Sequence, residues 1–453
     1  MQHRLSILLC VSAVTLGMIV FCFNVLAAAP DGEQNWPQWR GPLCSGVTPG
    51  GDPPTVWSES KNIRWKVKLP GQGTSTPIIW NNLVFVTAAI PTNQKAPPAE
   101  PAEPKPNIPA AMAGMMSAPP DVVYHFVLFC IDRQTGKALW QKICREAVPH
   151  EGHHRDHGYA SHSPVTDGKH VYAWFGSRGL HCFDLDGNLK WQKDLGRMKI
   201  KMSFGEGSSP ALYDNAIIIN WDNEGTSFIV AFDKETGAEL WRQTRDETTS
   251  WATPLVVRNA EKLQVVTSAS KKIRSYDFVT GQQLWECTGM TANVIPSPVA
   301  ANGIVYCLSG FRGNALLAIR LGRSGDLTGT DAIAFSIKKN TPYVPSPLLY
   351  DNRLYFFSGN AATLTCLNAA TGEPFYGAQQ VDGLEGVYAS PVGAGGRVYL
   401  VGRNGTSAVI KNADKFEVLS TNRLGDRIDA SPAIAGKDLI LRGQQSLYLI
   451  SEQ

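Results

Sequence analysis

The sequence predicts an all-β protein, a single eight-bladed β-propeller of four-stranded antiparallel blades. Three observations lead to this fold class. A Ser-Pro or Thr-Pro pair occurs eight times before a strand-like run, a second motif that ends in an aromatic residue follows most of these runs, and the repeat has the length of a propeller blade. An N-terminal strand is expected to complete the C-terminal blade and close the ring.

The N-terminus has the pattern of an export signal. His3 and Arg4 precede an apolar run from Leu5 to Leu26, and three alanines follow it. This pattern is typical of a signal peptide, predicted as residues 1–29 with cleavage after Ala29. The mature protein is then periplasmic or secreted and has no membrane span. The apolar run is also long enough to remain as an uncleaved membrane anchor, which is the alternative.

Two segments lie outside the repeats of the propeller, which is predicted to span residues 61–453. Residues 30–60 are rich in aromatic residues and proline and contain "WPQWRGP". We expect them to pack on the propeller as a cap without chemistry of their own. Residues 91–120 hold nine prolines and many alanines, so they cannot bury a core and are predicted to be a disordered insertion in blade one.

The Ser/Thr-Pro pairs mark the first strand of each blade. After the first interval of 87 residues, which includes the proline-rich tract, successive prolines lie 46, 44, 44, 49, 44 and 41 residues apart. This is the period of a four-stranded blade. The pairs begin at Thr76, Ser163, Ser209, Thr253, Ser297, Ser346, Ser390 and Ser431.

A turn followed by an aromatic residue forms the second motif. The Asp of this motif, or Asn368 in one copy, is expected to accept hydrogen bonds from the turn, and the Gly to supply a positive φ. The aromatic residue then packs between neighbouring blades. Blade five departs from the motif, with Arg320 at the Asp position, the inserted "LGRSGDLTGTD" and Phe335 near the Trp position. The copies are "CIDRQTGKALW" from Cys130, "CFDLDGNLKW" from Cys182, "AFDKETGAELW" from Ala231, "SYDFVTGQQLW" from Ser275 and "CLNAATGEPFY" from Cys366.

These copies resemble the AxDxxTGxxxW docking motif of PQQ-like repeats, which belong to the propeller family related to quinoprotein dehydrogenases. The resemblance covers roughly residues 61–453 and implies the eight-bladed fold. The opening "WPQWRGP" and the export signal are also similar to those of exported, planctomycete-type proteins that are described as BamB-like, after the outer-membrane assembly propeller.

Ring closure follows from counting strands. No turn-and-aromatic motif follows Pro432 before the chain stops at Gln453, whereas "NIRWKVKLP", with Trp65, precedes the first Thr-Pro pair. This N-terminal strand is therefore predicted to be the last strand of the blade that the C-terminus begins.

The cysteine pattern argues against a disulfide framework. Of nine cysteines, seven remain after cleavage, and this number is odd. Cys130, Cys182 and Cys366 take a small core position that Ala or Ser fills in other repeats, so we expect them to be buried thiols. One disulfide remains possible among the other four cysteines, which are Cys44, Cys144, Cys287 and Cys307.

The run "HEGHHRDHGYASHSP", from His150 to Pro164, contains the letters HExxH of zinc proteases. That chemistry needs a helix to bring two histidines to one face. Two glycines in the run disfavour a helix, and the run connects two blades, so we reject a protease. Solvated or hydrogen-bonding loop histidines are one alternative. The other is a looser metal site, since histidine-rich tracts bind metals, at His153, His154 and His157.

The connections between blades predict the binding site. Each connection from an outer strand to the next inner strand crosses one face toward the axis, so these loops converge on one mouth. Their aromatic, amide, acidic and basic side chains suit a polar ligand held between rings, or a peptide. Alternatively, they pack the channel without a ligand. The candidate binding residues are His162, Glu206, Trp251, Asn293, Tyr343, Tyr388, Arg427 and Asp429.

Two functions from different classes follow. The first is an exported, non-catalytic scaffold that binds a protein, a peptide or a cell-surface polymer at the mouth, as a monomer without catalytic residues. Nucleic acid is not expected as a partner, since the net charge is only +3.

The resemblance to quinoprotein alcohol dehydrogenases implies the alternative, an oxidoreductase that uses PQQ with calcium, or another metal. Those enzymes carry two adjacent cysteines, and this sequence has no such pair. They also carry a Glu, Asn and Asp set for calcium, for which Glu206, Asn293 and Asp429 have suitable chemistry. On the first interpretation we expect no cofactor.

Overall fold

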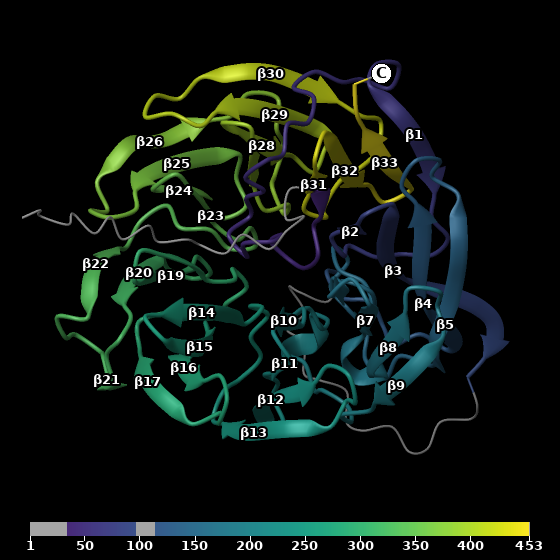
Figure 1. Ribbon diagram of the computed structural model, residues 1–453, viewed down its shortest axis with the longest axis horizontal. Coiled ribbons are helices and arrows are strands. Elements are labelled where there is room, and N and C mark those ends of the chain that lie inside the picture. Colours follow the sequence, from purple (N-terminus) through teal and green to yellow (C-terminus); the bar gives the residue numbers. More distant parts are fainter. Residues whose placement is uncertain (1–33, 97–113, 453) are drawn as a thin grey trace, which may run out of the picture. The chain divides into compact units, whose positions relative to one another are not determined.

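The protein is all-β, as predicted. The computed structural model describes residues 34–96 and 114–452. Eight sheets follow one another around a ring (Figure 1), seven of them four-stranded and one five-stranded. The described residues contain no α-helix and include two 3-10 helices, η2 (Gly176–Arg178) and η3 (Lys201–Ser203). Within these residues no helix has the length and apolar character that a membrane span requires.

The strands follow the predicted repeats, and in each blade the first strand named is the innermost. They are β2 (Ile78–Trp80), β3 (Leu83–Lys95), β4 (Val122–Asp132) and β5 (Ala138–Ala147) in blade 1; β6 (Val165–Thr166), β7 (His170–Trp174), β8 (Leu180–Asp184) and β9 (Leu189–Lys193) in blade 2; β10 (Ala211–Tyr213), β11 (Ala216–Trp221), β12 (Ser227–Asp233) and β13 (Glu239–Arg245) in blade 3; β14 (Leu255–Asn259), β15 (Lys262–Thr267), β16 (Ile273–Asp277), β17 (Gln283–Cys287) and β21 (Gly325–Asp326) in blade 4; β18 (Val299–Ala301), β19 (Ile304–Ser309), β20 (Ala315–Arg320) and β22 (Ile333–Ile337) in blade 5; β23 (Leu348–Tyr350), β24 (Arg353–Phe357), β25 (Thr363–Asn368) and β26 (Pro374–Gln380) in blade 6; β27 (Val392–Ala394), β28 (Arg397–Val401), β29 (Thr406–Lys411) and β30 (Val418–Arg423) in blade 7; and β31 (Ala433–Ala435), β32 (Asp438–Arg442), β33 (Ser446–Ile450) and β1 (Ile63–Lys68) in blade 8.

The predicted closure of the ring is confirmed. Strand β1 pairs antiparallel with β33, with Trp65 opposite Leu449. Blade 8 therefore takes three strands from the C-terminus and its outer strand from the N-terminal part of the chain. In Figure 1 the purple β1 lies beside the yellow β33.

The aromatic residues of the second motif pack between blades, as predicted. Trp241 on β13 donates its indole N–H to the backbone oxygen of Phe278 in blade 4, at 2.9 Å. Trp140 of blade 1 makes the equivalent bond to Leu185 of blade 2, also at 2.9 Å. The motif's Asp also acts as expected, since Asp233 accepts bonds from the backbone N–H and the hydroxyl of Thr236.

The irregular fifth repeat adds a strand to the neighbouring blade 4. Its insertion contains β21, which pairs parallel with β17 at the outer edge of blade 4, with Gly325 opposite Trp285. Trp285 donates its indole N–H to Gln264 within its own blade at 3.1 Å, and not to blade 5. Blade 4 therefore has five strands where four were predicted.

An N-terminal strap, residues 34–57, crosses the ring. Its backbone bonds to inner strands or to the residues just after them: Trp36 exchanges bonds with Ile79, Thr166 donates to Pro37, and Asp52 donates to Gly436. These partners lie downstream of the Ser/Thr-Pro pairs, so the strap lies toward the face opposite the predicted mouth. Figure 1 shows this purple segment near the centre of the ring.

The proline-rich tract is shorter than predicted. Its first residues, 91–95, belong to β3, where Pro91 lies opposite Tyr124 and Lys95 opposite Val122 in the ladder with β4. At its other end, Ser117 bonds to His153. Residues 97–113 lie outside the described residues, and so does the predicted signal peptide, residues 1–29, which stays a prediction.

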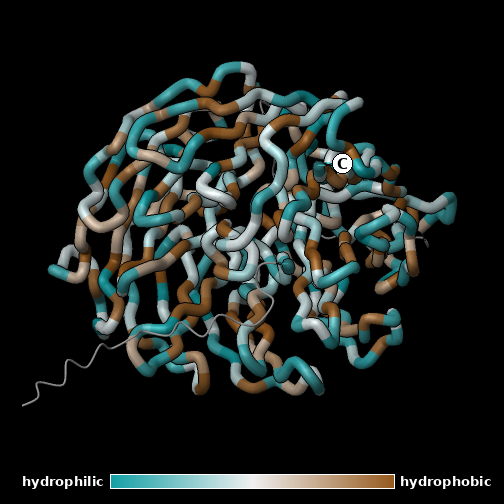
Figure 2. The backbone as a smooth tube through the Cα atoms, turned by 45° about the horizontal axis from the view of Figure 1, so that its top comes forward, coloured by the Kyte–Doolittle hydropathy of each residue, from teal (hydrophilic) through white to brown (hydrophobic). Residues whose placement is uncertain are grey.

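The seven described cysteines are all free. Cys130, Cys182 and Cys366 are fully buried, as expected for small core residues. Burial raises the pKa of Cys366 to about 12, so these thiols are poor nucleophiles. Apolar residues recur along the strands around the ring (Figure 2), as blades require when both faces of each sheet are covered by neighbours.

Candidate functional site

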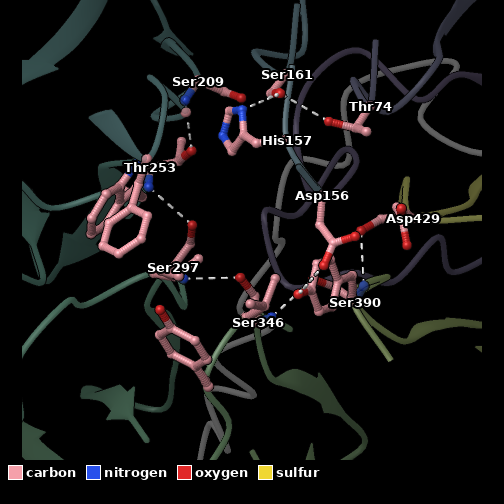
Figure 3. Close-up of a pocket in the computed structure, with 18 of the residues that line it drawn as sticks. Thr74, Asp156, His157, Ser161, Ser209, Thr253, Ser297, Ser346, Ser390 and Asp429 are labelled. Atoms are coloured by element: carbon pink, nitrogen blue, oxygen red, sulfur yellow. Dashed lines mark hydrogen bonds between the residues drawn. The ribbon is translucent and has the colours of Figure 1, made fainter. Parts of the chain in front are cut away.

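A pocket of about 350 Å³ lies on the axis, and residues from all eight connections between outer and inner strands line it. The loops therefore converge as the topology predicts. In Figure 3 the labelled side chains surround an open centre, with Asp156 and Asp429 on one side and Ser209 and Thr253 on the other.

A ring of hydroxyl groups surrounds the pocket. In seven of the eight Ser/Thr-Pro pairs, from Thr76 to Ser390, the backbone N–H of the Ser or Thr donates to the hydroxyl oxygen of the next blade's pair, at 2.9 to 3.0 Å. The hydroxyl of Thr76 closes the ring by donating to the backbone oxygen of Ser431 at 3.2 Å. The accepting hydroxyls, all of which line the pocket, belong to Ser163, Ser209, Thr253, Ser297, Ser346, Ser390 and Ser431.

This ring explains why the repeat carries Ser or Thr before Pro. The hydroxyl ties neighbouring blades together near the axis, and the buried backbone N–H requires a partner. Across the described part of the chain, none of the seven hydroxyls donates a hydrogen bond to the protein. Their O–H groups are therefore available to whatever fills the pocket.

Trp39 of the strap lines the pocket from the opposite end. Its indole N–H donates to the hydroxyl of Ser297 at 3.2 Å. The next residue, Arg40, anchors the strap by donating to the backbone oxygen of Pro347 at 2.8 Å. The pocket thus opens toward the loops and ends at the strap.

Aromatic side chains form much of the wall. Tyr343 stacks on Phe311, with ring centroids 4.9 Å apart and an interplanar angle of 25°. Trp251 packs near Phe204 and donates its indole N–H to the backbone oxygen of Gly205 at 2.7 Å, so its ring is held in place. Tyr343, Trp251 and Phe204 come from three different connections between blades, Phe311 comes from the turn between β19 and β20, and all four line the pocket.

Two carboxylates and two arginines form a charged cluster on one side. Asp156 lies 2.8 Å from Arg403 and 2.7 Å from Arg427. Asp429 lies 2.7 Å from Arg403 and 3.0 Å from Arg427. The Arg403 guanidinium sits 3.7 Å from the centroid of the Tyr388 ring. Burial raises the pKa of Asp429, against the opposing effect of Arg403. The four charges compensate one another, and they tie the histidine run to blades 7 and 8.

His157 faces the pocket from the histidine run. Its Nδ1 lies 2.8 Å from both the N–H and the backbone oxygen of Gly158, and 3.2 Å from the Ser161 hydroxyl, to which Thr74 donates. Because burial lowers the pKa of His157 to about 4, the ring is neutral near pH 7.

The rest of the histidine run confirms the rejection of a zinc protease. The run has no helix. The Nε2 of His150 bonds to the backbone oxygen of Met198 at 2.7 Å. Glu151 accepts the N–H of Ile200 at 3.1 Å, and burial raises its pKa to about 7. These two side chains fasten the run to the next connection.

The predicted binding residues divide into two groups. Trp251, Tyr343, Tyr388 and Asp429 line the pocket. The other four do not: Asn293 is buried, Arg427 forms part of the charged cluster beside the pocket, and the two remaining residues have partners elsewhere. His162 is buried against Trp174, and Glu206 is held by Ser177 and Arg178.

The predicted metal site gains no support from the geometry. His154 and His157 line the pocket but His153 does not, and Nδ1 of His153 bonds to a backbone oxygen. Within residues 34–96 and 114–452, only Asp167, His170 and Glu235 bring three ligand atoms within 4.8 Å of one another. There the carboxylate of Asp167 is already paired with Lys234 at 3.1 Å.

A calcium and quinone pair does not fit these residues. The expected oxygen donors Glu206, Asn293 and Asp429 are not brought together. Arg178 pairs with Glu206 at 3.1 Å, Asn293 is buried outside the pocket lining, and two arginines hold Asp429. Calcium needs six to eight oxygen ligands around one point. We derive no step through this cofactor.

Sequence reasoning missed several residues that line the pocket or lie beside it. Asp156 lies within the histidine run, and Trp39 lies within the strap that was expected to have no part in the site. The hydroxyl ring was visible as the repeat itself, but the repeat was used only to count blades. Arg403 lies in a hairpin turn of blade 7 and carries no motif that could have drawn attention to it.

Comparison with known proteins places the chain in a family. The profile of the family described as outer membrane protein assembly factor BamB matches residues 125–375, which is more than half of the chain. The chain belongs to this family. No curated protein matches the sequence. Among solved structures, BamB from Moraxella catarrhalis is 13% identical, with 80% of this chain and 98% of that chain covered and a TM-score of 0.48.

Two enzymes share the fold of this BamB-family chain. Quinohemoprotein alcohol dehydrogenase from Comamonas testosteroni is 10% identical, over 93% of this chain and 81% of that chain, with a TM-score of 0.61. Quinohemoprotein alcohol dehydrogenase ADHIIG from Pseudomonas putida HK5 is also 10% identical, over 92% and 80%, with a TM-score of 0.53. At this identity the similarity concerns the fold alone.

Proposed function

We propose that this protein is an exported, non-catalytic propeller that binds a protein, a peptide or a surface polymer at the mouth of its central channel. The observation that carries the proposal is the axial pocket, which joins fixed aromatic rings to hydroxyl donors that have no acceptor in the described part of the protein. Concave, largely apolar pockets with a few convergent polar groups are typical of binding sites.

Family membership supports a binding role over chemistry. The family is described as an assembly factor, and such a role requires contact with other molecules. We propose that the protein acts in the periplasm or outside the cell, as a monomer. The alternative, an oxidoreductase with PQQ and calcium, has the shared fold in its favour, but its calcium donors point to separate partners.

A comparison of two tyrosines tests the proposal. Tyr343 is half-buried, stacks on Phe311 and lines the pocket. Tyr213 is half-buried and packs on Phe278, outside the pocket. We expect Tyr343→Ala to lose a molecule that the parent protein captures from a cell-envelope extract, and Tyr213→Ala to retain it.

The opposite results would count against the proposal. Capture that is equal in the parent and both variants would place binding elsewhere on the surface. Stoichiometric uptake of added PQQ with calcium, together with alcohol-dependent dye reduction, would establish the oxidoreductase instead.

A further inference from the structure

We infer that the axial pocket binds the end of an uncharged saccharide chain. This inference rests on the proposed binding role of the mouth and specifies its ligand. Four features of the pocket support it: hydroxyl donors around the axis, compensated charge, aromatic walls and a closed end.

The hydroxyl ring calls for a ligand with many acceptor oxygens. Seven hydroxyls surround the pocket, and each already accepts a backbone N–H. Each retains one O–H, and buried donors without acceptors are unfavourable. Sugar hydroxyl and ring oxygens accept such bonds from several directions. One hydroxyl from each of blades 2 to 8 gives donors around most of a ring-shaped ligand.

The charges around the pocket indicate that the ligand is uncharged. Asp156 and Asp429 are paired with Arg403 and Arg427, so neither sign is left in excess. His157 is neutral, because burial lowers its pKa to about 4. A charged ligand group would have to break one of these pairs, which lie partly out of water and are costly to separate. A peptide terminus or an acidic sugar is therefore disfavoured.

The aromatic walls suit the apolar faces of sugar rings. Tyr343 and Trp251 approach the pocket from separate connections and are both held in place, Tyr343 by Phe311 and Trp251 by Gly205. The negative face of an aromatic ring attracts the C–H groups that a pyranose presents on its face. A saccharide thus uses both classes of lining residue, the rings and the hydroxyls.

The closed end selects the end of a chain over its middle. Trp39 lines the pocket from the strap side, so a polymer cannot pass through the ring. The volume of about 350 Å³ is near the lower limit of small-molecule sites and has room for about two sugar rings. Further rings would extend into solvent at the mouth.

A length series tests this inference. Neutral gluco-oligosaccharides with α-1,4 or β-1,4 linkage, and β-1,4-linked N-acetylglucosamine oligomers, each of one to six rings, are titrated into the full protein while tryptophan fluorescence is recorded. An uncharged tetrapeptide and tetragalacturonate serve as comparators. We expect one neutral series to bind, with an affinity that rises up to about two rings and then stays constant.

Variants assign the binding to the pocket. Trp251→Ala and Tyr343→Ala are expected to weaken binding about tenfold each, and Tyr213→Ala to leave it unchanged. Ser346→Ala removes one hydroxyl and is expected to weaken binding about threefold to tenfold. Ser346→Thr keeps a hydroxyl and is expected to bind like the parent. Should Ser346→Ala fail to fold, the aromatic variants decide the question.

Three outcomes would overturn the inference. One is that no neutral saccharide binds at about 10 mM. Another is an affinity that keeps rising through six rings, which indicates an open groove. The third is binding of the peptide or of tetragalacturonate with the same dependence on Tyr343. If saccharides fail but the captured envelope molecule is still lost with Tyr343→Ala, the proposed function stands and only its ligand class is wrong.

Discussion

At the residue scale, burial sets the chemistry of the histidine run. His162 has 2% of its surface exposed and packs edge-on against Trp174. Burial, with smaller effects from His157 and Arg178, lowers its pKa to about 3, and burial lowers the pKa of His157 to about 4. The pKa of Glu151 shifts in the opposite direction, because burial raises it to about 7.

These pKa shifts predict that acid weakens the fold. A histidine with a lowered pKa is neutral in the folded state. Between about pH 6.5 and its folded pKa, the unfolded chain therefore binds one more proton than the folded chain, and the free energy of unfolding decreases as the pH is lowered. Above about pH 4.5, the raised pKa of Glu151 has the opposite effect on the free energy of unfolding and offsets the contribution of one of the two histidines. We expect His162→Gln to reduce the slope of unfolding free energy against pH by about 1.4 kcal/mol per unit between pH 6 and 4.

Urea unfolding of the parent and of His162→Gln across this pH range measures the slope. The variant loses the packing against Trp174 at every pH, so the comparison uses the slope and not the absolute stability. Parallel curves would show that His162 does not stay neutral in the folded protein.

The orientation of each side chain limits what sequence could predict about the site. Trp251 and Tyr343 were predicted and line the pocket, since large rings beside the axis have little other space to fill. Glu206 and His162 lie on two other connections between blades but turn away, Glu206 toward Arg178 and His162 toward Trp174. The partners that hold them are distant in the linear motif, so no local pattern could reveal them.

At the element scale, blades are joined by a tryptophan that lies over a glycine. Gly281, in the turn between β16 and β17, has a φ of +71°, and a Cβ there would lie 2.5 Å from the Trp241 ring. The motif therefore needs glycine for two reasons, its backbone conformation and the approach of the ring. This was predictable from the repeat. The parallel strand β21 was not, because it depends on where an irregular insertion folds back.

A pair of glycine substitutions tests this docking. We expect Gly281→Ala to lower the free energy of unfolding by roughly 2 to 4 kcal/mol, from the left-handed backbone and the displaced ring. Gly377→Ala, in β26, is the matched control, because no atom lies within 4 Å of its added Cβ, and we expect it to be neutral or slightly stabilising. Equal effects in chemical denaturation would contradict the docking argument.

At the scale of the whole molecule, the ring has one seam, within blade 8, where β33 pairs with β1. The count of eight blades and the strand exchange at the seam followed from repeats that are evenly spaced. The path of the strap did not, since its partners, such as Thr166 and Gly436, are backbone groups without a sequence signature. The seam also carries a buried ion pair, with Arg133 of blade 1 at 2.8 Å from Asp438 of blade 8.

This buried ion pair makes the seam sensitive to a single change. Arg133 also donates to the backbone of the strap at Gln34, at 3.2 Å, so it joins three parts of the chain. Arg133→Met leaves Asp438 buried, with only the more exposed Arg64 nearby at 3.4 Å. Breaking a buried pair from one side costs about 3 to 5 kcal/mol.

We therefore expect Arg133→Met to lower the free energy of unfolding by about 3 kcal/mol or more and to speed hydrogen exchange first in β1 and β33. Arg133→Met with Asp438→Asn should recover part of this loss, because the buried charge is gone. Arg242→Met removes the arginine of an exposed pair with Glu239 and should cost less than about 1 kcal/mol. If the seam opens first, hydrogen exchange must rise in β1 and β33 before it rises elsewhere. Exchange that rises equally in all blades would instead mean that the ring opens as one unit.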